Sequence, residues 1–168
     1  MDATKYPEAD QKIFGGLIQM LEDIYADVRL ISHNMLPADL EARGLAAALN
    51  ELTENLNENP RTKFNLVLNG ETKRLDPKVE FELYNITLEL VNNIIKHARA
   101  SQVWLSLTQN DHVTVLTVSD NGVGFETDVQ SQGIGLRNIN ARVQTLGGEW
   151  KLESSPDAGS KVIVEVAA

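Results

Sequence analysis

Two pairs of alternating runs constrain the fold of this chain more than any other feature of its sequence. Apolar and polar residues alternate within each run, which is the pattern of a β-strand with one face buried. The runs QVWLSLTQ (102–109) and HVTVLTVSD (112–120) are separated only by Asn-Asp, and EWKLESS (149–155) and SKVIVEVA (160–167) by the turn PDAG. This spacing predicts two β-hairpins.

A further strand and three helices are predicted between and before these hairpins. The run KFNLVLNG (63–70) alternates as a strand that ends at Asn-Gly. Helical spacing is seen in LAAALNELTENL (45–56), from Pro77 to about Arg99 behind a capping Asp76, and in GLRNINARVQTLGG (135–148), which Gly-Gly closes. Hairpins with interleaved helices predict an α+β fold, a two-layer sandwich in which helices cover one face of a sheet.

A regular apolar seam precedes this domain. Seven apolar residues are spaced 3, 4, 3, 4, 3 and 4 apart, namely Phe14, Leu17, Leu21, Ile24, Val28, Ile31 and Met35. The seam predicts a helix from about residue 9 to 35 that packs lengthwise on another helix and ends before Pro37. An amphipathic helix on the domain's own core would show similar periodicity. Because no second helix of comparable length is predicted, we expect the partner to be another copy or a segment upstream of Met1.

Composition excludes several classes of function. The formal net charge is −9, which argues against a nucleic-acid partner or an anionic membrane surface. There is no cysteine, so disulfides and thiolate metal sites are excluded. The N-terminal MDATKYPEAD is polar, and no apolar run reaches the roughly 20 residues of a membrane span. We therefore expect the chain as given to be soluble and cytoplasmic and to make no direct membrane contact, whether or not the parent protein is anchored in a membrane.

A polar stripe runs along the predicted helix 77–99, opposite an apolar stripe of Leu83, Ile86, Leu90 and Ile94. Glu89, Asn93 and His97 follow one another at i+4 spacing, with Asn92 and Lys96 beside them. A carboxylate can accept a proton, an amide oxygen suits a hard cation, and Lys96 or His97 can reach phosphate oxygens. The alternative is a polar face that is solvated or hydrogen-bonded internally.

Two glycine-containing motifs follow. Asp120 ends an apolar strand and begins DNGVGF, where an ordinary Asn-Gly turn is one explanation and a carboxylate that accepts a purine amine is another. GIGL (133–136) leads into a helix, so it is either a flexible loop or a phosphate cradle. Asn138 stands where a dinucleotide motif needs its third glycine, and no phosphate-loop lysine motif is present.

These motifs, in this order, resemble one family. ELVNNIIKHARA, DNGVGF, GIGLRNINARV and GSKVIVEV look like the N box and glycine boxes of the histidine-kinase ATP-binding domain. The wider group includes gyrase, the heat-shock chaperone ATPase and mismatch-repair ATPases. ISHNMLPADLEARGLAAAL resembles the junction between the dimerisation helix and the ATPase in sensor kinases that pair with DNA-binding response regulators. The resemblance implies part of a dimerisation domain at 1–36 and the ATP-binding catalytic domain at 37–168.

The resemblance also implies a role for each motif residue. Glu89 would be the general base, Asn93 would hold Mg²⁺, and Lys96 and His97 would approach the phosphates of ATP. Asp120 would accept the adenine amine, and residues 126–132 would form a mobile lid. The remaining nucleotide-binding residues would be Gly122 and Gly124 at the pocket and the start of the lid, Gly133, Gly135 and Leu136 at the phosphates, and Gly159 and Ser160 near the adenine.

In this family the phosphorylated histidine lies on the first of two dimerisation helices. His33 is followed by Asn34 and matches the second helix, His97 belongs to the N box, and His112 lies in a hairpin. The resemblance therefore implies a fragment that binds nucleotide, lacks its own phosphoacceptor, and comes from a homodimer that passes phosphate to a response regulator. Alternatives are an anti-sigma-factor-type serine kinase, which needs no heptad helix, and a non-catalytic signalling module with a degenerate pocket.

Overall fold

The computed structural model describes residues 38–58, 61–127 and 134–167, so the helix expected at 9–35 lies outside the described residues. The described part begins with α2 (Ala38–Arg43), α3 (Leu45–Leu56), β1 (Lys63–Asn69) and α4 (Pro77–Asn93), which continues into η2 (Ile94–Ala98). β2 (Gln102–Gln109), β3 (Val113–Asp120), α5 (Ile134–Thr145), β4 (Glu149–Ser154) and β5 (Ser160–Ala167) follow.

The strands form one sheet in the order β1-β2-β3-β5-β4. β2 and β3 pair antiparallel, as do β4 and β5, so both predicted hairpins are confirmed. β3 and β5 also pair antiparallel, whereas β1 and β2 run parallel because α4 carries the chain from one to the other. One end of the β3–β5 register contributes to the site, since Asp120 at the end of β3 faces Ser160 at the start of β5.

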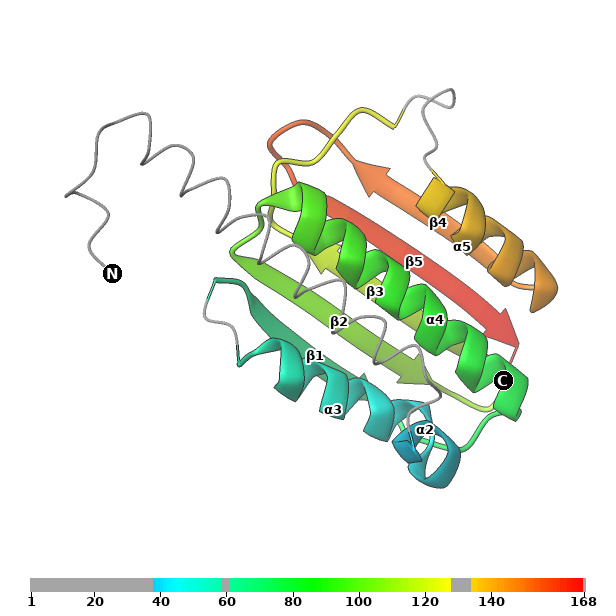
Figure 1. The fold of residues 1–168 in the computed structure, drawn as a ribbon. Coiled ribbons are helices and arrows are strands. Elements are labelled where there is room, and N and C mark those ends of the chain that lie inside the picture. Colours follow the sequence, from blue (N-terminus) through cyan, green and yellow to red (C-terminus); the bar gives the residue numbers. More distant parts are fainter. Residues whose placement is uncertain (1–37, 59–60, 128–133, 168) are drawn as a thin grey trace, which may run out of the picture. The chain divides into compact units, whose positions relative to one another are not determined.

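Helices α3, α4 and α5 lie on the same face of the sheet, which makes the two-layer α+β sandwich that the sequence predicts (Figure 1). The core between the layers includes Leu49, Leu83, Ile86, Leu105, Leu107, Leu116, Ile139, Val143 and Val164, all fully buried. The other face carries polar residues and isolated apolar ones such as Val67 and Trp104, which are 46% and 40% exposed. None of the described helices is long and apolar enough to cross a membrane.

Local chemistry sets where the helices begin and end. Asp76 caps α4 because its Oδ1 accepts a hydrogen bond from the backbone N–H of Lys78 (2.8 Å), and Pro77 follows as the first helical residue. At the end of α5, Gly147 adopts a positive φ of 64°, and the N–H of Gly148 donates to the carbonyl of Val143. This is the glycine-closed C-terminus that the sequence predicts.

The first turn of α4 contains a buried carboxylate that sequence inspection missed. Glu80 is 1% exposed. Its carboxylate accepts hydrogen bonds from Arg74 Nε (3.1 and 3.2 Å) and from the Leu75 N–H (3.1 Å), and Arg74 Nη2 lies 3.0 Å away. Arg74 Nη2 also donates to the carbonyl of Glu41 in α2. This group of contacts around Glu80, here called the clamp, therefore joins α2, the loop before α4 and α4 itself.

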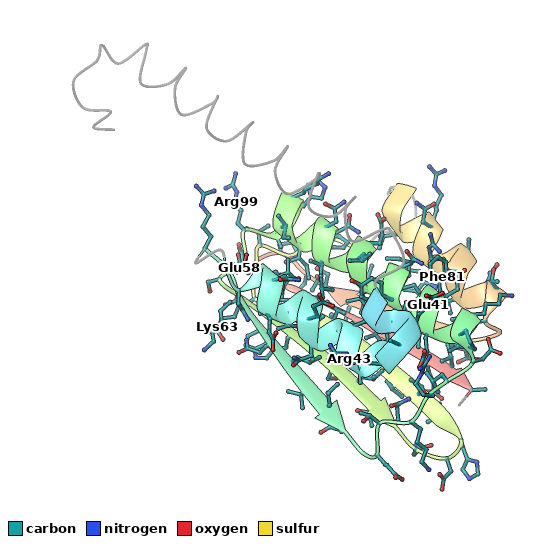
Figure 2. The ribbon with its side chains drawn as sticks, turned by 60° about the horizontal axis from the view of Figure 1, so that its bottom comes forward. Glu41, Arg43, Glu58, Lys63, Phe81 and Arg99 are labelled. Atoms are coloured by element: carbon teal, nitrogen blue, oxygen red, sulfur yellow. The ribbon has the colours of Figure 1, made fainter. Side chains whose placement is uncertain are left out.

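Figure 2 shows the two ends of the helical layer. Glu41 and Phe81 mark the end where α2 meets the start of α4, while Glu58 and Arg99 mark the opposite end. The clamp around Glu80 is at the first of these ends, and the functional site described next is built from the second half of α4.

Candidate functional site

The second half of α4 presents a polar stripe of graded exposure. Its apolar face is buried as predicted, with Leu83, Ile86, Leu90 and Ile94 at 7% exposure or less. On the other face Glu89, Asn92 and Asn93 are half-buried. The stripe is therefore partly withdrawn from water, which is the arrangement that requires internal partners or a ligand.

The helix changes its winding just after Asn93. The turn Ile94–Ala98 is π-helical, and Arg99 ends it in the left-handed conformation with φ of 51°. In a continuous α-helix, His97 would point about 80° away from Glu89, because each residue turns by about 100°. A π-helical turn rotates less per residue and so brings His97 back toward the Glu89 direction.

Asp120 ends β3 with its carboxylate held in place from two sides. The residue is 6% exposed. Its Oδ1 accepts a hydrogen bond from the Gly122 N–H at 2.7 Å, and its Oδ2 accepts one from the Ser160 hydroxyl at 2.5 Å. Each carboxylate oxygen can accept more than one hydrogen bond, so the group retains capacity for a further donor.

Glycines allow three backbone segments to meet around Asp120. A Cβ at Gly122 would lie 2.1 Å from the carbonyl oxygen of Ala98, and one at Gly159 would lie 2.0 Å from that of Asp120. Gly124 has a positive φ of 58°, and a Cβ there would lie 2.0 Å from the carbonyl oxygen of Ser155. Any larger residue at these positions would displace backbone, so the glycines are required by close approach.

Gly135 at the start of α5 faces the polar stripe of α4. A Cβ at this glycine would lie 2.5 Å from Glu89 Oε1 and 3.3 Å from Asn93 Oδ1. The two oxygens are therefore close to the N-terminus of a helix whose unpaired amides favour anions. Residue Asn93, and not its neighbour Asn92, faces this glycine.

One cavity of about 470 Å³ connects these groups. Its polar wall comes from Asn93, His97, Asp120 and Ser160, and Gly124 and Gly135 contribute backbone. Its apolar wall consists of Leu90, Ile94, Ala98, Val118, Val123, Phe125, Leu136, Leu152 and Val162. An apolar cavity with a few converging polar groups is the usual form of a small-molecule site.

Comparison with known families agrees with this geometry. Residues 78–168 match the family described as histidine kinase-, DNA gyrase B- and HSP90-like ATPase, and these residues are more than half of the chain. The chain belongs to this ATPase family. It contains an ATP-binding domain, and the resemblance seen in the sequence motifs is confirmed.

Relatives of this ATPase domain are named as sensor histidine kinases. An uncharacterized sensor-like histidine kinase of Chloroflexus aurantiacus is 32% identical over 150 residues, which cover 83% of this chain and 25% of the relative. The oxygen sensor histidine kinase NreB of Staphylococcus carnosus is 30% identical over 159 residues, covering 94% of this chain and 45% of the relative. The chain thus spans less than half of the length of these relatives.

A solved structure shows the same fold. The histidine kinase domain of a blue-light activated histidine kinase from Erythrobacter litoralis superposes with a TM-score of 0.63 at 23% identity. The match covers 73% of this chain and 60% of that one. The predicted α+β fold of a histidine-kinase ATPase domain is confirmed.

The cavity beside Asp120 gathers most of the residues that the motifs singled out. Asn93, His97, Asp120, Gly124, Gly135, Leu136 and Ser160 line it. Gly122 does not line the cavity, but its N–H donates to Asp120, which does. Gly159 lines a second cavity that shares Asp120 and Ser160 with the first. Glu89 does not line the cavity, although its carboxylate faces Gly135, which does. The exposed Lys96 is not part of the wall either. Gly133 and most of the expected lid lie outside the described residues.

Sequence inspection missed part of the apolar wall of the cavity, and it missed Ser154, which lines the neighbouring cavity. Phe125 and Leu152 belong to motifs that were read as a turn and a hairpin, and nothing in their spacing marks them as cavity residues. Ser154 ends β4, and its hydroxyl contacts both the loop after β3 and the start of β5. A serine within an alternating run carries no signal that separates it from a solvent-facing strand residue.

Proposed function

We propose that this chain is the ATP-binding catalytic part of a sensor histidine kinase. It transfers the γ-phosphoryl group of ATP to a histidine, from which a response regulator receives it. The observation that carries the proposal is the single cavity at which α4, β3, α5 and β5 bring Asn93, Asp120, Gly135 and Ser160 together. The names of the relatives favour histidine over serine as the acceptor.

Adenine recognition is assigned to Asp120. The exocyclic amine of adenine is a donor, and the Asp120 carboxylate is an acceptor whose position is fixed by Gly122 and Ser160. Guanine has a carbonyl oxygen at the same ring position, so lone pairs would face lone pairs. Buried carboxylates make such a mismatch costly, which gives a preference for adenine.

The phosphates and a magnesium ion are assigned to the other end of the cavity. Gly135 leaves room at the start of α5, and His97 supplies a donor at the cavity wall. Lys96 precedes His97 on η2 and would approach the phosphates from outside this wall. The described residues contain no cluster of three acidic or histidine side chains that would bind a metal alone. Asn93 Oδ1 fits Mg²⁺ in the usual mode of one or two protein oxygens plus substrate phosphates. When bound, the ion would neutralise charge on the phosphate oxygens.

Glu89 is assigned the proton transfer. Its carboxylate faces Gly135, and within the described residues it makes no hydrogen bond or ion pair. The acceptor imidazole nitrogen attacks the γ-phosphorus, the bond from this phosphorus to the β,γ-bridging oxygen breaks, and ADP leaves. Glu89 accepts the proton from the other imidazole nitrogen and so increases the nucleophilicity of the attacking one.

The partners follow from the same proposal. The parent protein would act as a homodimer, place the acceptor histidine on a dimerisation helix, and donate to a response regulator in the cytoplasm. Phosphohistidine is acid-labile and phosphoserine is not. An acid-stable product on incubation of the parent protein with Mg-ATP would therefore favour a serine kinase instead.

The test is an Asp120→Asn substitution with Asp111→Asn as its control. Both change an aspartate to its amide, but Asp111 lies in the turn before β3, at the opposite end of the strand, and pairs with Lys73. We expect Asp120→Asn to weaken Mg-ADP binding roughly ten- to hundredfold, since a hydrogen bond to a charged group contributes about 1.5–3 kcal/mol. Asp111→Asn should bind as wild type does. Equal affinity of all three proteins in calorimetric titration would refute the adenine assignment.

A further inference from the structure

The loop after β3, residues 121–127, has little packing that could hold it in place. Val123 and Phe125 are each 42% exposed, and Glu126 and Thr127 are exposed as well. The loop contributes to the walls of two cavities of about 470 Å³ each. Phe125 lines the cavity assigned to the nucleotide, and Thr127 lines a polar one over the turn between β4 and β5. Because cavities flank this loop, its position depends on its hydrogen bonds.

Asn121 and Gly122 at the start of the loop are hydrogen-bonded to the start of β2 and the end of β3, and three further hydrogen bonds hold the described residues that follow them. The Val123 N–H donates to the carbonyl of Ala98 (2.8 Å), and the Val123 carbonyl accepts from the Asp157 N–H (2.6 Å). Both are backbone to backbone, so no ordinary substitution removes them. The third differs, because the Phe125 N–H donates to the Ser154 hydroxyl oxygen (3.0 Å).

Ser154 connects this loop to the adenine end of the cavity. Its hydroxyl donates to the carbonyl of Gly159 (2.8 Å) while it accepts from Phe125. Ser160, which follows Gly159 in the chain, donates to the carboxylate of Asp120. The backbone of Gly124 passes so close to this strand end that a Cβ there would lie 2.8 Å from the Gly159 carbonyl oxygen.

We infer that Ser154 is a positioning residue that holds Phe125 and Gly124 against the nucleotide cavity; the inference rests on the proposed function. Without the hydroxyl, the Phe125 N–H loses its partner and the aromatic side chain is no longer fixed at the cavity wall. The nucleotide must then order the loop as it binds. That ordering reduces affinity and leaves the chemistry of Asp120 and Glu89 untouched.

The experiment compares three variants of the chain. Ser154→Ala removes the hydroxyl, and Ser154→Thr keeps it on a residue that strands favour. Ser155→Ala changes the neighbouring serine, which contacts Gly124 through its backbone carbonyl and keeps that group. Mg-ADP affinity is measured by calorimetric titration, and amide hydrogen exchange is followed over residues 121–127 and over β4 and β5.

We expect Ser154→Ala to weaken Mg-ADP binding roughly three- to tenfold, the effect of one hydrogen bond. The Phe125 amide should exchange faster without nucleotide, while the amides of β3 and α5 keep their protection. Ser154→Thr and Ser155→Ala should match wild type in both measurements. A residue that only stabilised the fold would instead raise exchange throughout the sheet.

Two results would overturn the inference. One is wild-type affinity in Ser154→Ala, and the other is an equal loss in Ser155→Ala, which would assign the effect to the turn as a whole. Either result leaves the proposed function intact as long as wild type binds Mg-ADP. Failure of wild type to bind would overturn the proposed function and this inference with it.

Discussion

Helix α4 carries two glutamates whose surroundings are opposite. Glu80 in the first turn is fully buried, and Arg74 and the Leu75 N–H supply donors to both of its oxygens. Glu89, nine residues later, is half-buried, faces Gly135, and has no hydrogen bond or ion pair within the described residues. A carboxylate whose donors all come from its own chain stabilises the fold, whereas one without them is available to a ligand.

The largest effect is expected from substitution of Glu89, on the rate of phosphoryl transfer. Glu89→Gln in the parent protein should slow histidine phosphorylation roughly 10²- to 10⁴-fold, because a general base is lost. Mg-ADP binding should not change, since Glu89 has no role in recognising the nucleotide. The measurement is single-turnover transfer from labelled ATP, with Glu165→Gln on the exposed side of β5 as control. If affinity falls as far as the transfer rate, Glu89 belongs to binding and the contrast with Glu80 fails.

The same substitution at the buried carboxylate should act on stability instead. Glu80→Gln places an amide N–H₂ against the Arg74 guanidinium and removes the ion pair, so we expect a loss of about 2–3 kcal/mol in the free energy of unfolding. Arg74 is half exposed and can turn to water, which keeps the loss below that of a fully buried pair. Urea unfolding measures it, and Glu89→Gln should remain within about 0.5 kcal/mol of wild type. Similar stability of the two variants would contradict the division of roles.

A smaller effect is expected on the pH dependence of stability, through the buried Tyr84 of α4. Burial, and then the charge of Glu51, raises the pKa of Tyr84 to about 12. The folded state therefore holds this proton more tightly than the unfolded state, whose tyrosine pKa is about 10. The stabilisation is complete below pH 10 and is lost as the pH rises toward 12.

Comparison with Tyr84→Phe isolates this titration. Relative to that variant, wild type should lose about 1.4 kcal/mol of stability between pH 8 and pH 11. Urea unfolding at both values measures the difference, since Phe cannot ionise and other alkaline titrations are common to both proteins. A constant difference across this range would mean that Tyr84 ionises equally well in the folded state.

Much of the fold followed from the sequence because its signals are local. The helix Leu45–Leu56 and both hairpins agree with the residues predicted for them. The parallel pairing of β1 and β2 did not follow, because two-residue alternation fixes which face is buried and not the direction of a neighbour. Alternation also does not show how deeply a strand residue is buried: Leu68 continues the alternation of β1 yet is 41% exposed at the sheet edge.

Residues of the site were predicted where a motif carries them, and the side-chain contacts between elements were not. Glu89, Asn93 and His97 share one helix, so their spacing was sufficient to group them. The π-helical turn that aligns His97 could not be read from composition. Arg74 with Glu80, and Ser154 with Phe125, become partners only through tertiary packing.

Gly135 has a consequence for attempts to make this domain more robust. A glycine in the first turn of a helix is an obvious target, because alanine loses less backbone conformational entropy on folding. Here the added methyl group would occupy the space beside Glu89 Oε1, at 2.5 Å, and push the carboxylate aside. A substitution chosen for thermostability would thus displace the proposed general base, so any stability gained at this position would be accompanied by slower phosphoryl transfer.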